Sequence, residues 1–424
     1  MNNRIYLCLA HMSGKEQTYI QEAFDTNWVV PLGPNVNGFE KDLESFVNGI
    51  SGQSGNGVLN KRVVALSSGT AAVHLGLIAC DVGPGDEVLV QSFTFCASSH
   101  PITYLGATPV FIDSEADTWN MDPVLLEAAI KDRIEKTGKV PKAIVPVALY
   151  GMPYRIDRIM AIADKYGIPV IEDAAEGFGS RFNGQVLGTF GKYGVLSFNG
   201  NKMITTSGGG ALITPNEDAW REVMMYATQY RESYPYYQHE KIGYNYRMSN
   251  ICAGIGRGQM TVANDHIAHH KHVQALYELL LKDVPGVKVH SQPATGEYDS
   301  NYWLCTITLD PALRVNGQEN SYKTVVKGAV GGAAGVIHMA ESATTDCQPN
   351  DNVEAMRVFL DAAGIEARPV WKPMHKQPVY KNAPAYVNGV SEAIFKVGMC
   401  LPAGPYVSDE DVKYIVETIK ESII

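Results

Sequence analysis

The 424-residue sequence lacks any apolar stretch long enough to cross a lipid bilayer. Its first residues, Met1 to Tyr6, also lack the layout of a secretory signal. Its seven cysteines are scattered and include no Cys-x-x-Cys pair, which is typical of reduced intracellular thiols rather than a disulfide framework. These absences predict a cytoplasmic protein with no membrane partner.

Positive charge is not in excess either. Lysine and arginine together number 35, against 45 aspartates and glutamates, so the net charge is −10 and the pI is about 5.6. A surface for nucleic acid is therefore not expected. A local basic pocket for a phosphorylated small molecule is still compatible with this charge.

Metal-binding motifs are scarce. His266 and His270 have the i, i+4 spacing of a metal pair, but no cysteine or carboxylate cluster nearby completes a site. We therefore predict that these histidines lie on the solvated face of a long helix that runs to about Leu281, and we predict no metal.

Two common nucleotide-binding motifs are missing as well. No Gly-x-Gly-x-x-Gly follows the first predicted strand, where Ser67-Ser68-Gly69-Thr70 stands instead, and there is no Walker-type loop. This argues against a nicotinamide dehydrogenase. A serine- and glycine-rich turn before a helix presents free backbone N–H groups that can bind phosphate, although serine and threonine also cap ordinary helices.

What the sequence does contain is a regular alternation of strand and helix patterns. Strands are predicted at 62–66, 85–90, 108–113, 142–147, 168–173, 194–196 and 211–213. Helices are predicted at 71–80, 94–105, 123–130, 156–166, 220–230 and 251–260. Such alternation is typical of an α/β fold with a mostly parallel, doubly wound sheet.

The chain length predicts two domains. We place a large domain with an N-terminal arm at 1–262 and a smaller C-terminal α/β domain at 263–424. The smaller domain has a predicted strand at 301–309 and predicted helices at 352–363 and 409–423. The aromatic and polar stretch 232–239 is predicted to be a loop that faces the site.

Three polar side chains, Ser68, Asp173 and Lys202, fall at predicted strand ends, where ligands of such sheets bind. Lys202 lies in a glycine-rich loop between two strands, and rigid strand ends can aim it. The ordinary alternatives are a surface lysine in a glycine turn and an aspartate that caps a helix. The functional alternative is a Schiff-base lysine together with a buried carboxylate under a cofactor.

An ordered set of short motifs favours the functional alternative. The set is Ser68-Gly69-Thr70-Ala71, Phe93-Thr94-Phe95, Glu172-Asp173-Ala174-Ala175-Glu176, Ser197-Phe198-Asn199-Gly200-Asn201-Lys202, Gly243-Tyr244-Asn245-Tyr246-Arg247-Met248-Ser249 and Arg368-Pro369. In this order it resembles the DegT-type sugar aminotransferases, which are fold-type I enzymes that use pyridoxal phosphate. The resemblance covers nearly the whole chain from Ile5 onward.

The resemblance implies a role for each matching position. Lys202 would hold pyridoxal 5'-phosphate as a covalent aldimine and later shuttle a proton, and Asp173 would pair with the pyridine nitrogen. Phe95 would stack on the ring. Glu176, where many relatives have glutamine or histidine, would contact the ring hydroxyl and must then share a proton or be protonated. The phosphate would be bound by the backbone of Gly69, Thr70 and Ala71 and by the Ser197 hydroxyl.

The resemblance also implies a partner subunit. Asn245 would reach the phosphate in the partner's site, so that a homodimer is needed for activity. Arg247 and His375 are candidate substrate-binding residues. The stretch at about 311–351 is longer than is usual in the family. It either covers the sugar site or is a surface insertion, and we favour the surface insertion.

Further motifs resemble one subgroup of the family. They are Asn199-Gly200-Asn201-Lys202, Ala227-Thr228-Gln229 and Trp371-Lys372-Pro373-Met374-His375. Enzymes of UDP-bacillosamine-type and polysaccharide pathways carry similar motifs, which implies amination at carbon four of a UDP-4-keto-6-deoxy-N-acetylhexosamine, with glutamate as donor. Amination at carbon three, a dTDP- or GDP-linked sugar, and a non-catalytic sensor with the same fold stay open as alternatives. Lys202 argues against the related sugar dehydratases, which have histidine at this position.

Overall fold

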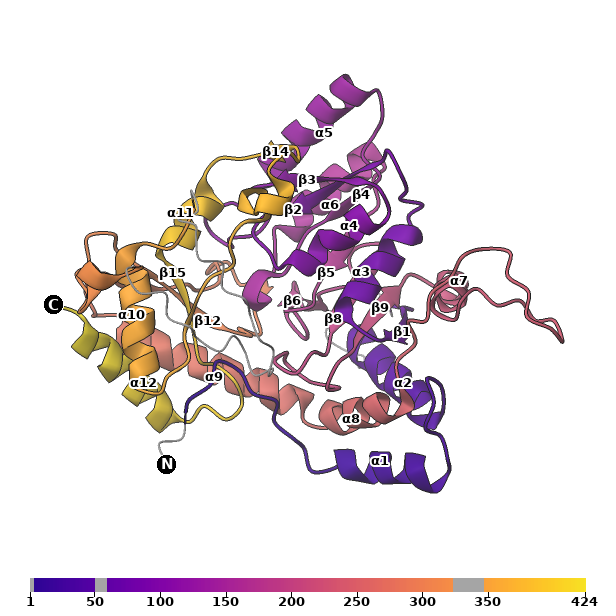
Figure 1. The fold of residues 1–424 in the computed structure, drawn as a ribbon, viewed down its shortest axis with the longest axis horizontal. Coiled ribbons are helices and arrows are strands. Elements are labelled where there is room, and N and C mark those ends of the chain that lie inside the picture. Colours follow the sequence, from indigo (N-terminus) through magenta and orange to yellow (C-terminus); the bar gives the residue numbers. More distant parts are fainter. Residues whose placement is uncertain (1–3, 50–58, 323–346) are drawn as a thin grey trace.

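A central sheet forms the body of the molecule (Figure 1). The computed structural model describes residues 4–49, 59–322 and 347–424. One half of the sheet contains, in spatial order, β1 (Arg62–Leu66), β9 (Gly210–Thr214), β8 (Tyr193–Ser197) and β5 (Ile171–Asp173). The other half continues with β4 (Ala143–Val145), β2 (Glu87–Gln91), β3 (Thr108–Ile112) and β14 (Ala385–Tyr386). Backbone bridges from Ile144 to Val170 and from Val147 to Asp173 join the two halves.

Most of this sheet is parallel. Parallel pairing joins β8 to β5, β4 to β2, β2 to β3 and β3 to β14, and the bridges between the halves are parallel too. β9 pairs antiparallel with both β1 and β8. The predicted α/β fold with a mostly parallel sheet is confirmed. The carboxyl ends of β1, β2, β5 and β8 therefore lie along one edge, which is where such sheets bind ligands.

Both faces of the sheet are buried under helices. Because successive side chains of a strand point to opposite faces, each strand contributes to two cores. Along β1, Val63 and Ala65 pack into one core, while Val64 and Leu66 pack into another. The first core includes residues of α2 (Pro34–Asn48), α5 (Pro123–Thr137) and α6 (Ile156–Tyr166). The second includes residues of α3 (Gly69–Ile78), α4 (His100–Tyr104) and α7 (Glu217–Ala227). This double cover explains why the strands are continuous apolar runs in the sequence.

The C-terminal third builds a second, antiparallel sheet. Its order is β10 (Val287–Val289), β12 (Cys305–Leu309), β15 (Gly398–Leu401) and β13 (Arg368–Pro369). A third core joins this sheet to α9 (Ala263–Leu281), α10 (Asp351–Ala362) and α12 (Asp409–Ser422). The same part of the chain also supplies β14 to the central sheet, so the central sheet contains strands from both sides of residue 263.

The remaining elements are short or peripheral. They are α1 (Glu16–Asp25), α8 (Asn250–Met260), α11 (Val390–Val397), β6 (Arg181–Phe182), β7 (Gln185–Val186), β11 (Tyr298–Asp299), and the 3-10 turns η1 (Cys96–Ser98), η2 (Leu149–Gly151), η3 (Gln318–Asn320), η4 (Met374–Lys376) and η5 (Pro378–Tyr380). In the described ranges, no helix combines the length and apolar character that a membrane crossing needs.

Several helix ends follow capping residues in the sequence. Ser68 opens α3 by accepting a hydrogen bond from the Ala71 amide, and the Asp122 carboxylate accepts from the first turn of α5. Ser408 and Asp411 form a capping box at the start of α12. Each cap satisfies backbone N–H groups that have no partner within the helix.

Some expectations differ from the structure. α1 lies where no helix was predicted, and α5 runs to Thr137 rather than 130. His266 and His270 are 4% and 0% exposed, so the predicted solvated face was wrong. The loop that contains 232–239 extends away from the body, beside α7 (Figure 1), instead of lining the site. Of the predicted insertion at 311–351, the part at 323–346 lies outside the described residues.

Candidate active site

A cavity of about 280 Å³ lies at the edge of the central sheet where β1, β2, β5 and β8 end. Its lining comes from the turns after these strands, from the loop between β8 and β9, and from Trp303 and Trp371 of the C-terminal third. Among the predicted site residues, the lining includes Gly69, Thr70, Phe95, Asp173, Glu176, Ser197 and Lys202. Segments far apart in the sequence therefore meet at one position in the fold.

The turn after β1 forms one end of this cavity. Ser68 accepts a hydrogen bond from the Ala71 amide at 3.0 Å, whereas the Gly69 and Thr70 amides occupy helix positions that have no intrahelical partner. Helix N-termini with such amides attract anions. We call Ser68, Gly69, Thr70, Ala71 and Ser197 the phosphate side. Ala71 itself is outside the lining, and its amide is already bound to Ser68.

Glycine is required where this turn meets the sheet. A Cβ on Gly69 would lie 3.0 Å from the Ser197 Cβ and 3.2 Å from its Oγ. A Cβ on Gly210 would lie 2.4 Å from the Gly69 nitrogen. These close approaches seat the helix N-terminus against β8 and β9, so that the Ser197 hydroxyl lies beside the free amides.

Asp173 ends β5 and lies at the buried floor of the cavity, 5% exposed. Its Oδ2 accepts a hydrogen bond from the Ser98 hydroxyl at 2.6 Å, and its Oδ1 accepts from the Ala175 amide at 3.2 Å. Burial raises the pKa of the Asp173 carboxyl, while Ser98 and the Lys202 charge oppose that rise. The carboxylate is thus fixed in direction and needs a cationic partner.

Lys202 projects into the same cavity and is 13% exposed. Its Nζ lies 3.4 Å from Glu176 Oε1 and 3.9 Å from the centroid of the Trp303 ring. The other carboxylate oxygen of Glu176, Oε2, accepts a hydrogen bond from the Tyr150 amide at 2.7 Å, which fixes the orientation of the carboxylate. Burial raises the pKa of Glu176, and the Lys202 charge opposes that rise. We call Asp173, Glu176, Lys202 and Trp303 the lysine side.

The backbone of Tyr150 is strained where its amide contacts Glu176. Its φ of 54° and ψ of 20° lie in the left-handed region, which non-glycine residues rarely adopt. This conformation aims the Tyr150 amide at the carboxylate, while its ring stacks between Trp303 and Trp371. Strain at this position indicates that the placement of Glu176 matters for function.

Phe95 lies at the mouth of the cavity. Its side chain is 49% exposed, and its ring centroid lies 5.2 Å from that of Trp371. An exposed aromatic face beside a cavity is available to stack on a planar ligand.

Besides Ala71, three predicted site residues are not part of this lining. Asn245 is exposed on a segment outside the cavity. Arg247 is buried: its Nη1 donates to Glu40 at 2.5 Å and to the Ala65 carbonyl at 2.9 Å. His375 Nδ1 lies 2.6 Å from the Ser92 hydroxyl. The structure therefore gives Arg247 and His375 structural partners instead of placing them at the cavity.

Sequence reasoning missed Ser98, Tyr150 and Trp303. Ser98 follows the Phe93-Thr94-Phe95 motif by three residues, and this proximity was a signal that its hydroxyl could belong to the site. Nothing local marks Tyr150 or Trp303, because their importance comes from contacts across the fold.

The donor set fits pyridoxal phosphate. Free amides at a helix N-terminus and a hydroxyl suit a phosphate, a buried carboxylate suits a pyridinium nitrogen, and a lysine amine suits an aldehyde. All three lie within one cavity. No group of three or more metal-ligating side chains is found in the described part of the chain.

An α/β fold with these three features along one sheet edge suits a pyridoxal phosphate-dependent enzyme, and comparison with known proteins identifies the class as aminotransferase. The chain belongs to the DegT/DnrJ/EryC1/StrS aminotransferase family, whose model matches residues 11–330 and 317–420. These are sugar aminotransferases, and pyridoxal phosphate is their cofactor.

Individual relatives match along nearly their whole length. EpsN of Bacillus subtilis (strain 168), assigned as a pyridoxal phosphate-dependent aminotransferase, is 41% identical over 99% of this chain and 96% of its own. GDP-perosamine synthase of Caulobacter vibrioides is 32% identical over 99% of both chains. A solved DegT/DnrJ/EryC1/StrS aminotransferase from Brucella abortus has a TM-score of 0.78 and 28% identity, and covers 96% of this chain and 95% of its own.

Proposed function

We propose that this aminotransferase transfers an amino group from glutamate to carbon four of a UDP-linked 4-keto-6-deoxy-N-acetylhexosamine, for polysaccharide or glycan biosynthesis. The observation that carries the aminotransferase chemistry is the enclosed Lys202 amine, which shares one cavity with Asp173 and with the phosphate side. The similarity to a GDP-perosamine synthase supports a nucleotide-sugar substrate, and the subgroup motifs support a UDP-linked one.

When bound, the cofactor supplies an electron sink for the carbon that gains or loses the amine. The Gly69 and Thr70 amides and Ser197 would hold its phosphate, and Asp173 would keep its ring nitrogen protonated. Lys202 would bind its aldehyde and, once released, would move a proton at Nζ. Glu176 lies close enough to share that proton, because its Oε1 is 3.4 Å from Nζ. The reaction then proceeds in two halves, with glutamate before the keto sugar.

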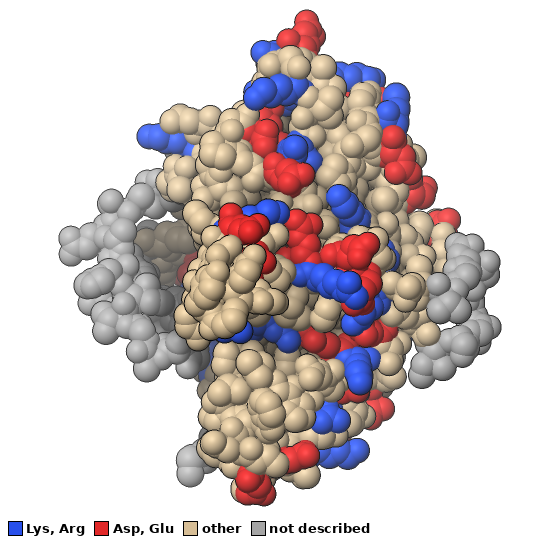
Figure 2. Space-filling model, turned by 90° about the vertical axis from the view of Figure 1, so that its right-hand side faces the viewer, with Lys and Arg blue, Asp and Glu red and all other residues tan. Residues whose placement is uncertain are grey.

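A second copy of the chain completes the site in this proposal. Tyr244 and Tyr246 stack on each other and turn towards His74, so the alternation of an extended segment points Asn245 the opposite way. Apolar side chains in the adjoining loop are exposed, among them Tyr236, Tyr237 and Ile242. On the face of the molecule that carries this loop, wide areas hold no charged side chain (Figure 2). These features suit a homodimer in which Asn245 reaches the partner's phosphate side.

Mixing two damaged variants tests the dimer. In a hybrid of Lys202→Ala and Asn245→Asp subunits, one site carries both changes and the other carries neither. We expect activity well above that of either variant alone after subunit exchange. No recovery in a mixture shown to contain hybrids would contradict sharing of the site.

A substrate panel tests the chemistry. Purified holoenzyme is incubated with UDP-, dTDP- and GDP-linked 4-keto and 3-keto sugars and with glutamate, glutamine or aspartate, and the products are identified by mass spectrometry and NMR. The proposal expects a UDP-linked 4-amino sugar formed from glutamate. A GDP-linked product would favour the alternative suggested by the GDP-perosamine synthase relative. A 3-amino product would establish the carbon-three alternative, and a holoenzyme that accepts no amino donor would favour a sensor.

A further inference from the structure

Trp303 contacts both the Lys202 amine and the backbone carbonyl that precedes Lys202. It is 2% exposed, and its indole Nε1 donates a hydrogen bond to the Asn201 carbonyl at 2.7 Å. The same indole places its ring centroid 3.9 Å from Lys202 Nζ. One side chain therefore fixes the backbone before the lysine and also contacts the reactive atom.

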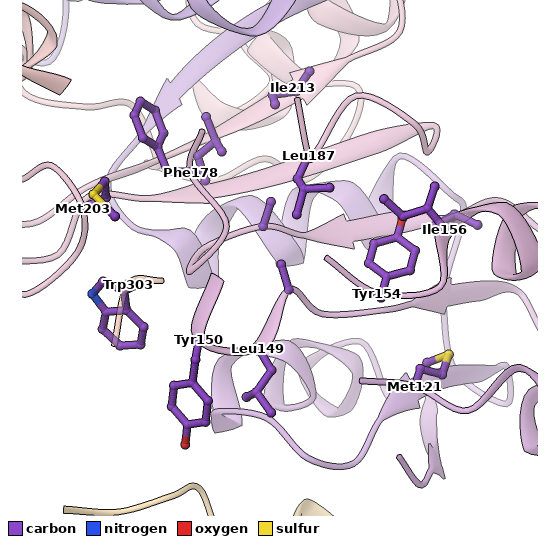
Figure 3. Close-up of a cluster of buried hydrophobic side chains, with 14 of the residues drawn as sticks. Met121, Leu149, Tyr150, Tyr154, Ile156, Phe178, Leu187, Met203, Ile213 and Trp303 are labelled. Carbon is purple, nitrogen blue, oxygen red and sulfur yellow. The ribbon is translucent and has the colours of Figure 1, made fainter. Parts of the chain in front are cut away.

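The backbone after the lysine is fixed as well. His266 Nδ1 lies 3.1 Å from the Met203 carbonyl, and because a carbonyl only accepts, this nitrogen carries the hydrogen. The Lys202 amide donates to the Asn199 carbonyl at 2.9 Å. Figure 3 shows Met203 and Trp303 on the same side of the buried cluster. The backbone before and after Lys202 is thus held by Trp303 and His266, which both come from the chain after residue 262.

Trp303 is itself anchored to the floor of the cavity. The buried Asn301 side chain accepts from the Trp303 amide at 2.8 Å and donates to the Glu176 and Phe178 carbonyls at 2.9 Å. Gly151 packs closely against this side chain, because a Cβ at position 151 would lie 1.8 Å from Asn301 Oδ1. The indole is therefore fixed relative to both Glu176 and the Lys202 loop.

We propose that Trp303 is a positioning residue that holds the Lys202 amine whenever it is released from the cofactor. This inference rests on the assignment of Lys202 as the cofactor lysine. In each half-reaction the freed Nζ takes a proton from carbon, so that a C–H bond breaks, an N–H bond forms and an ammonium group results. The face of an indole attracts an ammonium group. Glu176 Oε1, which lies 3.4 Å from Nζ, supplies the opposite charge. The lysine then stays beside the carbon to which it returns the proton.

The experiment compares Trp303→Phe and Trp303→Leu, each in the wild-type and the Lys202→Ala background. Phenylalanine keeps an aromatic face but loses the indole N–H, and leucine loses both. Trp220→Leu is the matched control, because the Trp220 indole also donates to a carbonyl, that of Val63 at 3.1 Å, and lies 4.8 Å under the Arg62 guanidinium, away from the cavity. Stopped-flow absorbance follows formation of the Lys202-linked cofactor, and equilibrium titration gives the cofactor affinity.

Trp303→Leu is expected to slow formation of the Lys202-linked cofactor and to lower kcat, each by roughly 10-fold, with little change in KM for the sugar. Trp303→Phe should lose roughly 3-fold. Neither change should alter cofactor affinity when Lys202 is absent, because Trp303 acts through the lysine. Trp220→Leu should alter none of these quantities.

Equal loss of cofactor affinity in both backgrounds would overturn the inference, because it would show direct contact with the cofactor or general disturbance of the site. Unchanged rates in Trp303→Leu would overturn it too. If Trp303→Leu does not fold, Trp303→Phe is judged in the same way, by its cofactor affinity in both backgrounds and by its rates. A wild-type protein without Lys202-dependent absorbance would instead refute the proposed function, so the two failures are distinguishable.

Discussion

The two sides of the cavity are built in different ways. The phosphate side comes almost entirely from one continuous turn, in which Ser68 caps α3 and leaves the next two amides free. The lysine side is assembled from segments as distant as Asp173, Lys202 and Trp303, and each of its groups is fixed by a partner elsewhere in the chain. A phosphate needs only oriented N–H groups, whereas a proton shuttle needs an amine held in place through two half-reactions. In the proposed function, the phosphate side therefore binds the cofactor and the lysine side carries out the chemistry.

The two sides also differ in what they cost the stability of the fold. On the phosphate side, the Ser68 cap satisfies the Ala71 amide, and the two amides left free carry no net charge, so this side costs the fold little. On the lysine side, two carboxyl groups are buried near one lysine, and burial raises the pKa of both Asp173 and Glu176. The strained backbone of Tyr150 adds to that cost. In the proposed function, a cationic pyridine ring bound beside Asp173 would offset part of this cost.

The largest expected effect is on the support beneath the phosphate side. Arg247 pairs with the buried Glu40 and holds the Ala65 carbonyl of β1, the strand that leads into this turn. Arg247→Met leaves Glu40 buried without its partner, so the free energy of unfolding should fall by about 3–5 kcal/mol in urea denaturation. Adding Glu40→Gln should recover much of the loss. A raised KM for the sugar at unchanged stability would contradict this and restore Arg247 as a substrate residue.

On the lysine side, Asp173→Asn removes the charge but keeps the shape. Because the amide cannot hold the ring nitrogen protonated, kcat should fall by about 100- to 1000-fold, while cofactor still binds through the phosphate side. Single-turnover kinetics with glutamate measures this step. Near-normal turnover in Asp173→Asn would mean that the carboxylate acts only as a structural partner of Ser98.

On the phosphate side, Gly69→Ala should have the opposite signature. Its Cβ would press on Ser197 at 3.0 Å and displace the free amides, so cofactor affinity should weaken by about 10-fold while kcat at saturating cofactor stays normal. Gly83→Ala is the matched control, because nothing lies within 4 Å of a Cβ at that position. A lower kcat with normal affinity in Gly69→Ala would erase the distinction between the two sides.

The same contrast decides how much the sequence could predict. The α/β alternation, the strands β1 to β5, β8 and β9 and the Ser68 turn follow from local periodicity and capping, and the structure has them close to the predicted positions. The two-residue strands β6 and β7 were not predicted. The positions of Asp173 and Lys202 at strand ends follow in the same way. Their partners do not, because Ser98, Tyr150 and Trp303 acquire their roles only when distant segments meet.

Two misjudged positions show the same limit. His266 looked like part of a solvated helix face, yet it is buried and holds the Met203 carbonyl behind Lys202. Arg247 stood in a motif with Asn245, but the two neighbours face different surroundings, one buried against Glu40 and the other exposed. Residue type and spacing do not reveal which side of an irregular segment faces the core.

The most direct test of this account is the visible absorbance spectrum of the purified protein with pyridoxal phosphate, before and after glutamate, beside Lys202→Ala. The account predicts a band of covalently linked cofactor that requires Lys202 and that glutamate converts to the spectrum of the amine form. A wild-type spectrum that equals that of Lys202→Ala would contradict the assignment of the lysine side as the reaction centre.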